Sequence, residues 1–121
     1  MATAGEFVGL MFFERSVAHA NHLTTSLFSR HDALQKFYEG IVELADDFSE
    51  AYIGRFGDID EIQMSWASPE DEIIDFLQGS LEWIEANRYM VAPQRDTALQ
   101  NIIDEIVSLH LSTLFLLKRL M

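Results

Sequence analysis

The sequence predicts an all-α fold, a four-helix bundle in which a connection of about ten residues joins the middle two helices. Four long segments carry apolar residues at the three- and four-residue spacing of an amphipathic helix. No segment shows the apolar–polar alternation of a half-buried strand. Because the chain has 121 residues, we expect a single domain over residues 1–121.

The first two helices are predicted over residues 5–27 and 30–56. Apolar side chains occupy much of the circumference of the first helix, so it should be buried on more than one side. Ser29 is placed to be the N-cap of the second helix, and Asp32 completes a capping-box pattern. Gly57 is a candidate for the left-handed position that ends this helix.

The last two helices are predicted over residues 68–90 and 96–120, separated by Pro93. A Ser-Pro-Glu-Asp sequence supplies a strong start signal for the third helix. The connection before it, residues 58–67, should pack onto the bundle because it holds four large apolar residues: Ile59, Ile62, Met64 and Trp66.

Composition excludes several classes of function. The net charge of −12 and the lack of a basic tail argue against direct DNA binding, which needs clustered lysine and arginine. No apolar run is long enough for a transmembrane helix, and the N-terminal residues lack the basic region of a signal peptide. The absence of cysteine is consistent with a cytoplasmic protein, which is what we expect.

The second helix carries a row of carboxylates on the face opposite its apolar residues. The row consists of Glu39, Glu43, Asp46 and Glu50, at spacings of four, three and four, and His31 and Gln35 lie upstream of it. Two interpretations are open. The row is either a solvated helix face, or part of a site for a hard cation, because carboxylates with imidazoles suit iron, manganese or zinc.

Geometry limits how such a site could be built. Fifteen helical residues separate His31 from Asp46, which is roughly 22 Å at ~1.5 Å per residue, so one chain cannot place both on one ion. His19 and His31 both lie near the link between the first two helices and could converge. A complete site would then take these histidines from one subunit and Asp46 and Glu50 from a two-fold partner.

Familiar catalytic motifs are missing from the sequence. It has no phosphate-binding glycine loop, no GxSxG and no HExxH. The Glu-x-x-His pairs of a di-iron site inside a bundle are also missing, since His110 follows Glu105 by five residues. We therefore interpret His110 as a packing residue and expect no conventional intra-bundle di-iron centre.

The stretch from His19 to Glu50 resembles the signature of the miniferritins called DNA-binding proteins from starved cells (Dps), which are ferritin-like. Four positions match with spacings of 12, 15 and 4: His19, His31, Asp46 and Glu50. The resemblance implies a ferritin-like fold and a ferroxidase centre shared across a dimer interface. It also implies Fe2+/Fe3+ as the metal, with zinc or manganese as alternatives, and a homo-oligomer that is at least a dimer and up to a dodecamer. Iron storage or detoxification would follow.

The chain departs from the Dps pattern in three ways. Gln35 replaces an additional acidic ligand, Ala20 replaces a tryptophan, and the central connection is shorter. The alternative function is a non-catalytic ferritin-like module that binds metal weakly or not at all and acts through oligomerisation or partner binding. A third possibility is an acidic bundle without metal. Glu39 and Glu43 would be accessory residues on a cation entry path, or simply solvated.

Overall fold

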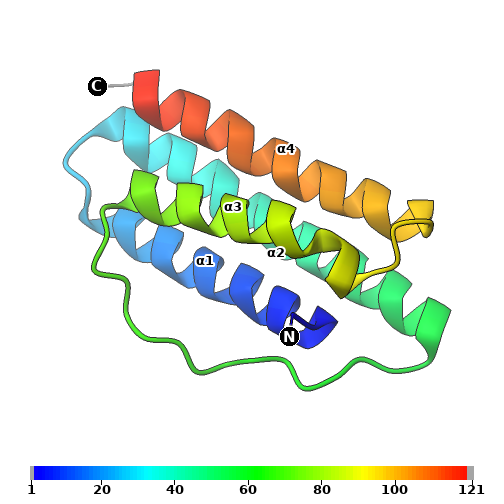
Figure 1. Ribbon diagram of the computed structural model, residues 1–121. Helices are drawn as coiled ribbons and strands as arrows, with labels where there is room; N and C mark the ends of the chain where they lie inside the picture. The colour runs from blue at the N-terminus through cyan, green and yellow to red at the C-terminus, as the bar shows by residue number, and fades with distance from the viewer. Residues whose placement is uncertain (1, 120–121) are drawn as a thin grey trace.

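The computed structural model describes residues 2–119, and within them the protein is all-α, as predicted (Figure 1). No described helix is long and apolar enough to cross a lipid bilayer. The four helices and their bounds are α1 (Ala4–Thr24), α2 (Phe28–Phe56), α3 (Ile73–Val91) and α4 (Thr97–Arg119).

The helices form two antiparallel pairs that pack on each other. Short links join α1 to α2 and α3 to α4, and contacts between the pairs run from α1 to α3 and from α2 to α4. Residues 58–72 run back along the outside of the bundle, so α3 starts at the same end as α2 (Figure 1). The arrangement is therefore a four-helix bundle with one long crossover connection. The predicted short connection over residues 58–67 is wrong, because the crossover extends to residue 72 before α3 begins.

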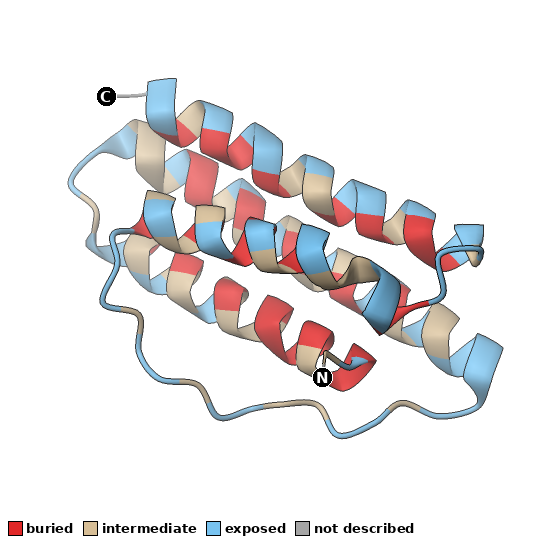
Figure 2. Cartoon of the chain, viewed as in Figure 1, coloured by how far each residue is buried: buried red, intermediate tan, exposed pale blue. Residues whose placement is uncertain are grey.

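The core lies where the apolar faces of the helices meet (Figure 2). Phe7 of α1 and Phe48 of α2 pack edge to face with ring centroids 4.9 Å apart. The apolar stripe predicted for α2 is confirmed at five positions that are fully buried: Leu34, Phe37, Ile41, Ala45 and Phe48. Each of the four larger side chains contributes about 1.5–3 kcal/mol through its burial.

The predicted start of α2 is wrong. The helix begins at Phe28 with Leu27 as its N-cap and no side-chain cap, so Ser29 and Asp32 both lie inside the helix and neither caps it. The N–H of His31 already bonds the Leu27 carbonyl oxygen at 3.0 Å. The predicted end is confirmed, because Gly57 adopts the left-handed conformation (φ 85°) and its N–H bonds the Ile53 carbonyl oxygen.

The predicted start of α3 at residue 68 is also wrong. The helix begins at Ile73, and the Glu72 side chain accepts a hydrogen bond from the Ile74 N–H at 3.0 Å. Glu72 also pairs with Arg30 of α2 at 2.7 Å, so a tertiary contact fixes this N-cap. The local Ser-Pro-Glu-Asp signal instead belongs to the irregular crossover.

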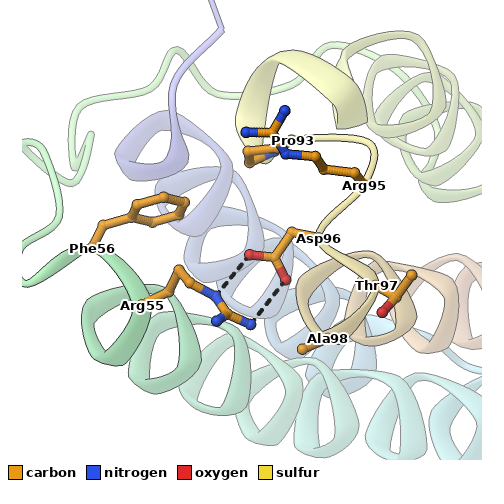
Figure 3. A pocket seen from close by; sticks show the side chains of 7 residues that line it. All are labelled: Arg55, Phe56, Pro93, Arg95, Asp96, Thr97 and Ala98. Carbon is orange, nitrogen blue, oxygen red and sulfur yellow. Dashed lines mark hydrogen bonds and ion pairs between the residues drawn. The ribbon is translucent and has the colours of Figure 1, made fainter.

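The start of α4 is fixed by Asp96, close to the prediction. Its carboxylate accepts a hydrogen bond from the Leu99 N–H at 3.3 Å and pairs with Arg55 of α2 at 3.0 Å (Figure 3). One side chain therefore caps α4 and joins it to the end of α2. The predicted end of α4 at residue 120 lies outside the described residues.

The crossover packs against α1 at two glycines. Of its four large apolar residues, Ile59, Ile62 and Trp66 are partly buried against the core as expected, whereas Met64 is 75% exposed and its predicted packing is wrong. The Gly5 N–H donates to the Asp60 carboxylate at 3.1 Å, and the Gln63 N–H donates to the Gly5 carbonyl oxygen at 3.3 Å. A Cβ added at Gly9 would lie 2.1 Å from the Gln63 carbonyl oxygen. A helix-interior glycine costs about 1 kcal/mol relative to alanine, and here it allows the close backbone contact.

We predict that Gly9→Ala lowers the free energy of unfolding by about 1–3 kcal/mol, because the crossover backbone must move away from the added methyl group. Gly54→Ala in α2 is the matched control, since a Cβ there meets nothing within 4 Å. The control should be neutral or stabilising by up to about 1 kcal/mol. Urea unfolding followed by circular dichroism measures both. Equal stability of the two variants would contradict this packing.

Candidate functional site

Three histidines gather where α1 ends and α2 begins, and we call this group (His19, His22 and His31) the histidine corner. The link between the helices is only residues 25–27, so the two helix ends lie side by side. Nδ1 of His22 donates to the His31 carbonyl oxygen at 2.7 Å, and Nδ1 of His31 donates to the His22 carbonyl oxygen at 2.8 Å. The two rings stack with centroids 3.6 Å apart.

These reciprocal hydrogen bonds fix the protonation pattern of both rings. A carbonyl oxygen only accepts, so Nδ1 of His22 and of His31 must each carry a proton. In the neutral ring the Nε2 lone pair is then available as a metal ligand. His22 is buried, whereas His31 is half-buried and has the better access to a ligand.

His19 lies beside this pair rather than directly against His31. Its ring stacks on Tyr38 of α2 at 4.3 Å and lies 5.9 Å from the ring of His22. The structure therefore brings the two predicted histidines to one corner, with His22 in contact with both. Sequence reasoning missed His22. The signal was present, because residues 22 and 31 lie four and five positions from the middle of the short link and so come close together when the two helices pair.

The predicted row of carboxylates is exposed, on the side of α2 away from the core. Glu43, Asp46 and Glu50 line an open hollow between α2 and α4, together with Asp47 and Glu105. No basic side chain lines this hollow. The arrangement attracts cations and disfavours anions.

The predicted accessory residues Gln35 and Glu39 are linked on the same helix. The Gln35 amide nitrogen donates to the Glu39 carboxylate at 3.0 Å, four residues on. Gln35 is half-buried and Glu39 is exposed. The amide oxygen of Gln35 is left as the only ligand atom that this side chain offers, and it is neutral.

The two halves of the predicted site stay apart within one chain. His31 and Asp46 lie on the single continuous helix α2, about 22 Å apart at ~1.5 Å per residue. Among residues 2–119, no group of three or more histidine, cysteine, aspartate or glutamate side chains could hold a metal ion. The three residues of the histidine corner therefore do not form such a group within one chain. A site built from these residues would need a second chain.

A separate polar pair occupies the middle of the core. Glu14 of α1 and His110 of α4 are fully buried, and Nε2 of His110 contacts the Glu14 carboxylate. Nδ1 of His110 donates to the Ile106 carbonyl oxygen at 2.8 Å. His110 was predicted to be a packing residue, and its ring does pack edge to face on Phe37. Its buried partner Glu14 was not predicted.

The surroundings favour the charged form of His110. Burial by itself lowers the pKa of His110, but the adjacent Glu14 carboxylate and the hydrogen bonds to Glu14 and Ile106 outweigh it, so the pKa is raised. Oε1 of Glu14 is buried and has no hydrogen-bond partner among the described residues. The pair is therefore a buried ion pair, incompletely satisfied on the carboxylate side.

Residues 22–117 match the model of DUF5856, a family of unknown function, and the chain belongs to this family. Comparison with curated proteins and with solved structures gave no match. The family match covers His31, the acidic row and His110, whereas His19 lies just before it.

We predict that Glu14→Leu destabilises the protein by about 3–5 kcal/mol at pH 6, because a buried imidazolium loses its partner. Because the pKa of His110 is raised in the folded protein, the ion pair stabilises the fold fully at pH values below the unfolded-state pKa of about 6.5. This stabilisation is lost as the pH rises through the folded-state pKa. The decrease in the free energy of unfolding caused by Glu14→Leu should therefore be smaller at pH 9 than at pH 6. Urea unfolding at both pH values measures it.

The double variant Glu14→Leu/His110→Phe is the control for this prediction. It removes both charges and should recover most of the stability that either single change removes. A loss that is the same at pH 6 and pH 9 would contradict the ion pair.

Proposed function

We propose that this chain is a Dps-like member of the ferritin-like superfamily, which takes Fe(II) as a substrate and oxidises it between two subunits. The bundle topology supports the proposal, because ferritin-like folds also have four helices with one long crossover connection. The matching spacing of His19, His31, Asp46 and Glu50 supports it independently.

The main support for the proposal is that His31, from the histidine half of the site, and Asp46, from the carboxylate half, lie along one face of α2. His31, Gln35, Tyr38, Val42 and Asp46 follow one another at three- and four-residue spacing, so they share a face, and every one of them is half-buried or exposed. This face is left partly open by the other helices. It is therefore available to the same face of a second copy.

Antiparallel pairing of two copies along this face completes the site. If the two-fold axis passes between Tyr38 and Glu39, His31 of one chain lies opposite Asp46 of its partner chain. The interface is isologous, so the same contact occurs twice and gives two equivalent sites.

Each ligand has a defined role in this arrangement. His19 and His31 supply neutral nitrogen, while Asp46 and Glu50 supply negative charge, with Glu50 placed to bridge two ions. The hydrogen bond from Nδ1 of His31 to the His22 carbonyl oxygen holds the ring with Nε2 free. Two Fe(II) ions each lose one electron, and one peroxide molecule takes both electrons with two protons to give two waters. Oxygen is the alternative oxidant.

The acidic hollow beside the site supports a path for the incoming cation. Glu39 and Glu43 extend the carboxylate row toward the histidine end of α2, and the net charge of −12 favours cation uptake. The same charge opposes DNA, so we expect iron binding and storage without direct DNA binding. Assembly beyond the dimer, up to a dodecamer, would provide a storage cavity.

One observation favours the alternative, a ferritin-like module without catalysis. Gln35 is neutral and its amide is bonded to Glu39, so the second ion position lacks a carboxylate at this point. Ala20 also leaves the position after His19 without an aromatic side chain. Such a module would bind metal weakly or not at all and act through oligomerisation. Metal binding without Fe(II) oxidation would identify it.

We predict that His31→Ala and Asp46→Ala each abolish metal binding as homodimers, but partly complement each other when mixed. A mixed dimer keeps one intact site, built from His31 of the Asp46→Ala chain and Asp46 of the His31→Ala chain. Random mixing makes half of the dimers mixed, so about a quarter of the wild-type metal should return. Metal content after anaerobic equilibration with Fe(II) measures it.

Glu85→Ala is the matched control, because Glu85 is an exposed carboxylate on α3, away from the proposed site. It should keep the wild-type metal content. Metal retained by either single variant, or no recovery in the mixture, would contradict a shared site.

A further inference from the structure

A cleft on another side of the bundle lies between α1, α3 and the crossover. Its volume is about 280 Å³, and its walls combine aromatic side chains with carboxylates. The residues that matter for its chemistry are Trp66, Trp83, Phe76, Glu6, Asp71 and Asp75. It is separate from the histidine corner and from the acidic hollow of α2.

The aromatic wall is held in place before any ligand arrives. The indole N–H of Trp66 donates to the Gln63 carbonyl oxygen at 3.0 Å, and its ring stacks on Phe13 at 5.4 Å. Phe13 in turn packs edge to face on Phe76 at 5.6 Å. Because these contacts fix the rings, binding needs little additional ordering of the wall.

The cleft carries negative charge without any compensating cation. Glu6, Asp71 and Asp75 line it, and no lysine, arginine or histidine does. None of these three carboxylates is in an ion pair within the described part of the chain. A cation entering the cleft would therefore meet unpaired carboxylates next to apolar walls.

Ser80 adds a buried polar group to the same cleft. Its residue is 7% exposed and lines the cleft, and none of the hydrogen bonds found within residues 2–119 involves its hydroxyl group. Because Ser80 lines the cleft and its hydroxyl has no hydrogen bond to the described part of the protein, the hydroxyl is available to a bound ligand. It would accept a hydrogen bond from an N–H group.

We propose that this cleft binds a small organic cation, an ammonium group on an apolar body. The ammonium would lie among the carboxylates and against a tryptophan face, where cation–π attraction adds to the charge attraction. The apolar body would pack on Leu10 and Phe76. The volume, close to the lower end of the ~300–1,000 Å³ typical of small-molecule sites, suits a ligand of this size rather than a protein segment.

Intrinsic fluorescence tests this proposal directly, because the only two tryptophans of the chain, Trp66 and Trp83, both line the cleft. The full-length protein is titrated with hexylammonium, with the neutral 1-hexanol and with the anionic hexanoate at low salt. We expect a saturable change with hexylammonium, binding at least about ten-fold weaker with hexanol, and none with hexanoate.

Variants then locate the binding. Asp71→Asn/Asp75→Asn should weaken hexylammonium binding by at least about ten-fold, whereas Glu105→Gln, which removes a carboxylate from the α2–α4 hollow, should leave it unchanged. Circular dichroism checks that each variant is folded. No saturation with hexylammonium, equal affinity for hexanol, or full binding by the double variant would each overturn the proposal. The comparison of ligands on the wild-type protein needs no variant to fold.

Discussion

The reciprocal hydrogen bonds between His22 and His31 are the contact on which the arrangement of the first two helices depends. They join the last turn of α1 to the first turn of α2 across a link of three residues, and so set the register of the antiparallel pair. Tyr38 lies about two turns beyond His31 in α2, where its ring stacks on His19. The carboxylates at the far end of α2 face solvent because the apolar stripe of the same helix is buried in the core. The local contact therefore positions the histidine half of the proposed iron site, and core packing positions the carboxylate half.

Contacts between residues far apart in the sequence hold the second pair of helices against the first. Glu14 and His110 join α1 to α4 across the centre of the bundle, 96 residues apart in the chain. The crossover passes over Gly5 and Gly9, which admit its backbone against α1. This passage leaves the cleft between α1, α3 and the crossover. The topology thus produces two separate surfaces, the α2 face that we propose for a second copy and the cleft that we propose for a small cation.

The periodicity of apolar residues correctly predicted which helix face is buried. Local capping signals failed to predict helix starts where tertiary contacts compete with them. The apolar stripe of α2 and its end at Gly57 were predicted because both follow from the chain itself. The starts of α2 and α3 were not, because the short link and the Arg30–Glu72 pair override the serine signals. Glu14 could not be predicted, since a single carboxylate in an apolar helix does not reveal its partner.

Native mass spectrometry of the wild-type protein after anaerobic equilibration with Fe(II) tests the shared iron site most directly. We predict iron on dimers or larger even assemblies, with up to two equivalent sites per dimer and none on the monomer. The monomer lacks a suitable ligand group among its described residues. Iron bound to the monomer, or dimers that remain free of iron, would contradict a ferroxidase site shared between two copies of α2.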